Sequence, residues 1–175
     1  MRQTVGILGT AVDVMNADQV LARLEQFVDQ GRFHQVATAN SDFLINARHD
    51  PELQHILDTA DLVIADGMPV VWAARIFRNP LPERVTGADI VPRLAALAER
   101  RRFGMYLLGG KPEVTAGAAG ALAQAYPALR IVGHSSPPNA TLLEMDSEPI
   151  LQDIERTKPD ILLVALGNPK QEKWI

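Results

Sequence analysis

The sequence predicts an α/β fold, with a mostly parallel, Rossmann-like sheet and helices on both of its faces. Short apolar runs that end in Gly, Asn or Asp alternate with segments of helical periodicity along the chain. Strands separated by helices in this way pair in parallel, because each helix covers a face of the sheet. No internal repeat, low-complexity tract or linker interrupts the pattern, so we expect one domain over residues 1–175.

The first half of the chain opens with an expected strand at 5–8. A helix follows, in which Asn16 is the cap, Gln19 is its capping-box partner and Gly31 ends the helix. The remaining elements of this half are a strand at 35–39, a helix capped by residues 40–42, a strand at 62–65 and a helix with Pro69 in its first turn.

The second half continues the alternation. Its expected elements are a helix at 88–101, a strand at 105–108, a helix from 112 to about 126, a strand at 129–132, a loop at 135–149, a helix at 150–157 and a strand at 160–166. Gly117 and Gly120 fall inside one of these helices, where we expect them to allow close packing.

Composition excludes several classes of function. The formal net charge of −4 and the lack of a dense basic stretch argue against a nucleic-acid partner. The absence of cysteine rules out disulfides, thiolate zinc sites and a cysteine nucleophile. No clustered His, Asp or Glu pattern suggests a metal, and we expect no cofactor. No signal peptide or membrane span is evident, so we expect a cytoplasmic protein.

Polar residues gather where the expected strands end. In parallel sheets ligands bind beyond the carboxyl ends of the strands, so these residues are the candidates for chemistry. The set comprises Thr38, Asn40, Asp42, Asp66, Gly67, Glu83, Arg84, Thr86, Gly109, Gly110, Lys111, Asn168, Lys170, Gln171 and Glu172.

Each candidate also has a purely structural explanation. Asn40 is a good helix cap, Asp66 before Gly67 suits a turn, and Gly109 with Gly110 can close a strand-to-helix turn. Three known functional motifs were compared with the sequence as alternative sites, and none of them fits. A Walker A loop lacks its Ser or Thr after Lys111, no G-x-G-x-x-G follows a strand, and the acidic pair of a response-regulator receiver is missing after the first strand.

Six segments together resemble the WecG/TagA/CpsF family of bacterial glycosyltransferases. They are TANSDFL at 38–44, DLVIADGMPVVWAAR at 61–75, PERVTGADI at 82–90, YLLGGKPEV at 106–114, YPALRIVG at 126–133 and PDILLVALGNPKQEKWI at 159–175. They occur in the order of that family and cover nearly the whole chain.

The resemblance implies an inverting, metal-independent transfer from a UDP-sugar to a sugar on a polyprenyl diphosphate, in the synthesis of teichoic acid or exopolysaccharide. The donor sugar would be of the N-acetylmannosamine type, its uronic acid or a hexose. By the same resemblance Asp66, from the ADG motif, is the expected general base. Thr38, Asn40, Arg84 and Gln171 match substrate-pocket residues.

Two further expectations complete this reading. Members of the resembled family usually continue past P-K-Q-E into a basic segment linked to membrane association. This chain stops at Ile175. From the resemblance we expect peripheral binding at the inner face of the cell membrane for a full-length protein. A homo-oligomer is left open. The alternatives are a hydrolase or epimerase acting on nucleotide sugars, and a non-catalytic domain that binds nucleotide sugars or serves regulation.

Overall fold

The computed structural model describes residues 2–138 and 140–175, which divide into two compact units. The N-terminal unit contains residues 2–91 with residue 175, and the C-terminal unit contains residues 92–174. The division falls inside helix α5 (Gly87–Arg101). A single domain over the whole chain stays a prediction.

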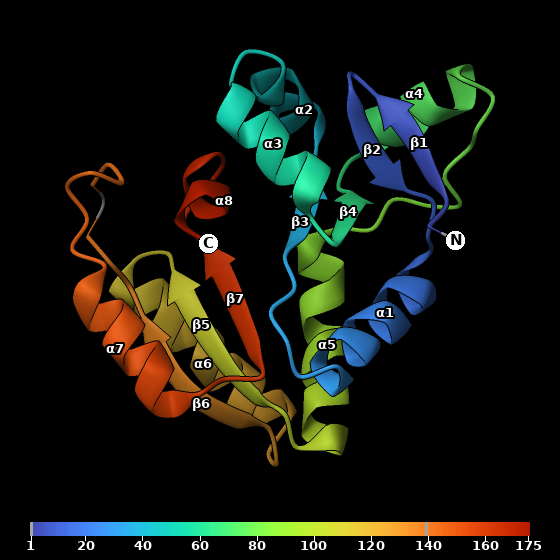
Figure 1. Ribbon diagram of the computed structural model, residues 1–175. Coiled ribbons are helices and arrows are strands. Elements are labelled where there is room, and N and C mark those ends of the chain that lie inside the picture. Colours follow the sequence, from blue (N-terminus) through green and yellow to red (C-terminus); the bar gives the residue numbers. More distant parts are fainter. Residues whose placement is uncertain (1, 139) are drawn as a thin grey trace. The chain divides into compact units, whose positions relative to one another are not determined.

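The strands of the N-terminal unit form two pairs (Figure 1). They are β1 (Thr4–Ile7), β2 (Thr10–Asp13), β3 (Val36–Ala39) and β4 (Leu62–Ala65). The first two are antiparallel, with Thr4 opposite Asp13. Leu8 and Gly9 connect them with φ values of 51° and 93°, the left-handed backbone that a tight hairpin turn requires. The other two are parallel, with Ala39 opposite Ala65.

The helices of the N-terminal unit pack against these strands. They are α1 (Ala17–Asp29), α2 (Ser41–Ala47), α3 (Pro51–Thr59), α4 (Met68–Ile76) and the start of α5. The predicted capping box of α1 is confirmed, because Asn16 and Gln19 exchange both bonds. Helix α3 was not expected from the sequence, although Asp50 caps it and Pro51 occupies its first turn.

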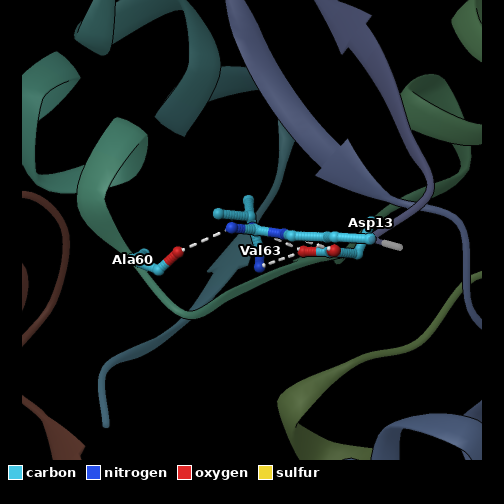
Figure 2. Close-up of polar contacts among 4 residues, drawn as sticks. Asp13, Ala60 and Val63 are labelled. Atoms are coloured by element: carbon cyan, nitrogen blue, oxygen red, sulfur yellow. Dashed lines mark hydrogen bonds and ion pairs between the residues drawn. The ribbon is translucent and has the colours of Figure 1, made fainter.

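An ion pair between exposed Arg2 and buried Asp13 joins the β1–β2 hairpin to β4. Arg2 Nε donates to Asp13 over 2.7 Å, and Arg2 Nη1 donates to the carbonyl of Ala60 over 2.9 Å. Asp13 is only 2% exposed, and its carboxylate also accepts the N–H of Val63 over 2.7 Å. Figure 2 shows these contacts as dashed lines, with Asp13, Ala60 and Val63 labelled. The hydrogen bond from Arg2 to Asp13 raises the pKa of the guanidinium, so Arg2 stays charged.

The C-terminal unit is a three-stranded parallel sheet in the order β6-β5-β7 (Figure 1). Its strands and helices are β5 (Gly104–Gly109), α6 (Pro112–Ala125), β6 (Arg130–Ser135), α7 (Glu148–Thr157), β7 (Ile161–Ala165) and α8 (Lys170–Trp174). Its core centres on Tyr106, Leu108 and Ile150. Buried Tyr106 donates its hydroxyl to Asp153 over 2.8 Å, and burial together with that carboxylate raises the pKa of Tyr106 to about 12.

The predicted α/β class is confirmed, with parallel strands in both units and the expected Rossmann-like alternation. One strand was not expected from the sequence, and one local expectation was wrong. The segment after the first strand forms β2, because a tight turn folds it back onto β1. Gly117 and Gly120 do not serve close packing, since a Cβ atom on either would meet nothing within 4 Å. Within residues 2–138 and 140–175, no helix has the length and apolar character of a membrane span.

Candidate active site

Asn40 and Asp66 leave the same edge of the parallel pair β3–β4. Their preceding residues, Ala39 and Ala65, are opposite each other in the register, and the N–H of Asp66 donates to the carbonyl of Ala39 over 2.9 Å. The next residue, Gly67, has a φ of 146°, which a side chain would strain. A Cβ atom on Gly67 would lie 3.8 Å from Asn40 Cβ, so the starts of α2 and α4 are neighbours.

The carboxylate of Asp66 is half-buried and faces the first turn of α5. Its Oδ2 lies 3.5 Å from the backbone nitrogen of Gly87. A Cβ atom on Gly87 would lie 3.8 Å from Thr38 Cγ2. Thr38 and Asp66 therefore both border Gly87, and the N-terminal unit brings the predicted base together with the threonine of the T-x-N motif.

Asn40 is exposed, and its side chain caps α2. Its Oδ1 accepts the N–H of Phe43 over 2.9 Å, which confirms that Asn40 is a helix cap. Only the oxygen of the side-chain amide serves the cap. The NH₂ group of the same amide is a hydrogen-bond donor, and it is the part of Asn40 suited to bind a ligand.

Arg84 lies in the loop before α5. The N–H of Val85 donates to the carbonyl of Ala65 over 2.9 Å, which fixes this loop to the residue just before Asp66. The guanidinium of Arg84 lies 3.4 Å from the carboxylate of Asp89, which also accepts the hydroxyl of Thr86 over 2.7 Å. Sequence reasoning missed Asp89, although its spacing from Thr86 is that of a helix-capping pair.

Gly109 and Gly110 form the turn after β5 in the C-terminal unit. Their φ values of 118° and 70° are positive, and a Cβ atom on Gly109 would come within 2.2 Å of the carbonyl oxygen of Ala165. The same oxygen accepts the N–H of Gly110 over 3.1 Å. The hydroxyl of Thr115 donates to the carbonyl of Gly109. These glycines therefore allow β5 and β7 to approach closely, and the N–H of Gly110 is engaged with β7.

Gln171 lies in α8, after β7 in the same unit. Its Oε1 accepts the N–H of Gly167 over 3.2 Å, and its Nε2 donates to Glu172 Oε1 over 2.7 Å. Glu172 is 4% exposed and also accepts from Asn168 over 3.2 Å. Burial raises the pKa of Glu172, and these hydrogen bonds only partly oppose that shift. The buried carboxylate thus holds the amide of Gln171 in place.

The predicted residues therefore occur in two groups. Thr38, Asn40, Asp66, Gly67 and Arg84 surround the β3–β4 edge of the N-terminal unit, whereas Gly109, Gly110 and Gln171 surround the β5–β7 edge of the C-terminal unit. That the two groups serve one substrate stays a prediction. Among the residues that the structure describes, no three His, Asp or Glu side chains come together in a way that could hold a metal ion.

Comparison with known proteins adds an independent line of support. The model of the family described as "Glycosyl transferase WecG/TagA/CpsF family" matches residues 5–175. A Bacillus subtilis (strain 168) protein named N-acetylglucosaminyldiphosphoundecaprenol N-acetyl-beta-D-mannosaminyltransferase is 28% identical over 151 residues, which are 86% of this chain and 57% of that protein. A protein of the same name from Staphylococcus aureus (strain MRSA252) is 28% identical over 173 residues, or 98% of this chain and 66% of that protein.

The relatives are longer than this chain, whereas the family model is matched over nearly all of the chain. The chain spans less than two thirds of either relative, so the activity of a whole relative does not pass to it directly. The family model, by contrast, covers nearly all of the chain and every candidate residue named above. This chain belongs to the WecG/TagA/CpsF family of glycosyl transferases.

Proposed function

We propose that this chain is the catalytic part of an inverting, metal-independent glycosyltransferase acting at the inner face of the cell membrane. It transfers a sugar from a UDP-sugar to a sugar carried on a polyprenyl diphosphate. The names of the relatives favour an N-acetylmannosaminyl group as the sugar and N-acetylglucosaminyl diphosphoundecaprenol as the acceptor. The observation that carries the proposal is the convergence of Thr38, Asn40, Asp66 and Gly67 at one strand edge, beside the loop of Arg84.

Asp66 is the proposed general base. In an inverting transfer, the acceptor hydroxyl attacks the anomeric carbon while the bond to the diphosphate breaks on the opposite side. The base takes the proton of that hydroxyl, and the UDP leaves with the electron pair. Asp66 suits this role because it directly follows β4 and because its carboxylate is only half-buried.

The other residues would bind the substrates. Arg84 offers a planar set of donors for a phosphate or a sugar carboxylate, and Asp89 orients it in the absence of ligand. Thr38 and the amide of Asn40 are neutral groups suited to sugar hydroxyls. Gln171 is a further proposed substrate-binding residue, and Glu172 holds its amide.

The test uses a protein extended to the length of the relatives, with UDP-N-acetylmannosamine and a lipid-linked N-acetylglucosamine acceptor. Asp66→Asn keeps the size of the side chain and removes the base, so turnover should fall by about 10²-fold or more. Asp58→Asn is the matched control, since this exposed carboxylate on α3 serves only Gln54 among the bonds described here. Chelation with EDTA should leave turnover unchanged, and the product linkage should have the inverted anomeric configuration.

Three outcomes would contradict the proposal. Near-normal turnover of Asp66→Asn would remove the base assignment. Free N-acetylmannosamine formed equally well without acceptor would indicate a hydrolase. Donor binding by calorimetry with no product under any condition would indicate a non-catalytic binding domain.

A further inference from the structure

Helix α4 has a second apolar face that the fold leaves exposed. Val70, Val71 and Ala74 are buried in the core of the N-terminal unit. On the opposite side Met68, Trp72 and Ile76 recur at every fourth position, and their exposed fractions are 39%, 55% and 77%. A helix at the surface of a protein in water normally presents polar residues on that side. Contiguous large apolar side chains in such a position mark an interaction surface.

The charged side chains within and just after α4 have one sign. Arg75 and Arg78 are exposed within and just after α4, and residues 67–82 contain no Asp or Glu. This contrasts with the whole chain, whose formal net charge is −4. Of the neighbouring acids, half-buried Asp66 faces Gly87 at the start of α5, Asp13 is buried and paired with Arg2, and Glu83 accepts the N–H of Ala17. The face is therefore locally cationic as well as apolar.

An apolar hollow continues the exposed face toward β1. It has a volume of about 200 Å³, and its lining includes Ile7, Leu8, Leu44, Pro69, Val70 and Phe77. Phe77, the residue after α4, is itself 61% exposed. The apolar surface thus extends beyond the helix and could accommodate acyl chains or an aromatic anchor at its rim.

We propose that this surface, the α4 face (Met68, Trp72, Arg75, Ile76, Phe77 and Arg78), docks onto an anionic lipid bilayer. Trp and Phe suit the headgroup boundary, and the two arginines complement anionic headgroups. The functional benefit rests on the proposed function. Because α4 begins directly after Asp66 and Gly67, docking of this face would hold the site close to a diphosphate carried by a membrane lipid.

The first experiment measures flotation of the full chain with two kinds of vesicle. One is made of equal parts phosphatidylglycerol and phosphatidylethanolamine, and the other of phosphatidylcholine alone. We expect binding to the anionic vesicles and weaker binding at high salt. Ile76→Glu should lower the bound fraction about tenfold or more. Leu151→Glu is the matched control, because Leu151 is a similarly exposed apolar residue on α7, at 51%.

A second pair of variants tests the charges. Arg75→Gln with Arg78→Asn should weaken binding about tenfold. Arg100→Gln with Arg102→Asn removes the same charge elsewhere and should not. The pairs are well matched, since Arg78 and Arg102 both have positive φ values, of 57° and 60°. Brominated acyl chains should quench the fluorescence of the wild type but not that of Trp72→Phe.

Several results would overturn the proposal. Wild-type protein that fails to float with anionic vesicles contradicts it, as does an equal loss in Ile76→Glu and Leu151→Glu. A dimer in sedimentation that Ile76→Glu dissociates, without vesicle binding, would make the face a contact between copies of the chain. Transfer to a short-chain acceptor in solution separates this proposal from the preceding one. If wild type binds vesicles but never transfers sugar, the enzyme assignment fails and the docking surface stands.

Discussion

The side-chain oxygen of Asn40 accepts the N–H of Phe43 over 2.9 Å, so a residue of the candidate site is also the cap of α2. The two roles use different atoms of one amide and can be separated. Asn40→Asp should retain the cap and the free energy of unfolding, but it loses the NH₂ donor and should raise KM for the donor sugar.

Asn40→Ala should lose both roles and destabilise the protein by about 1 kcal/mol. Asn16→Ala on α1 is the control, because Asn16 caps its helix over the same 2.9 Å but is not a candidate site residue. Urea denaturation and donor kinetics measure the two effects. Unchanged kinetics in Asn40→Asp would show that this residue is only a cap.

Removal of Arg2 from its pair with Asp13 should destabilise the protein substantially. Arg2→Met leaves the buried carboxylate of Asp13 with the N–H of Val63 as its remaining described partner, which should cost about 3 kcal/mol. Arg32→Met removes an exposed ion pair with Asp61, whose closest atoms are 3.8 Å apart, and should cost less than about 1 kcal/mol. Denaturation midpoints compare the two variants, and equal losses would contradict the importance of burial.

Gly109 should tolerate no side chain. The Cβ atom of Gly109→Ala would collide with the backbone of β7 at Ala165 and would also strain a positive φ, so we expect a loss of more than about 3 kcal/mol. Gly117→Ala, in open space on α6, should instead stabilise the protein by roughly 0.5–1 kcal/mol. Thermal unfolding of both variants checks the pair. A stable Gly109→Ala protein would contradict the close approach of β5 and β7.

Glu172 should make stability depend on pH. Its folded pKa is raised above the ordinary 4.5, so the folded state binds the proton more tightly than the unfolded state. Stability should therefore fall as the pH rises from about 4.5 through the raised pKa, and then level off. Glu172→Gln cannot ionise, and its unfolding free energy should lack this decline. The same pH profile for wild type and variant would show that the buried carboxylate titrates normally.

The sequence alone determined the features that depend on neighbouring residues. Alternating apolar runs and helical periodicity predicted the parallel strands β3, β4, β5, β6 and β7 and the helices between them, except for α3. The capping box of Asn16 and Gln19 also followed from spacing, because a cap involves residues within one turn. The family motifs could be recognised for the same reason, because each is a short segment of neighbouring residues.

The tertiary structure decided what depends on residues far apart in the chain. It folded residues 10–13 back as β2, buried Asp13 against Val63, and placed Gly87 beside both Thr38 and Asp66. It also showed that Gly109 is needed for the approach of Ala165, whereas Gly117 is not needed for packing. Local patterns carry no information about these contacts, because steric fit and the burial of charge arise only when distant segments meet.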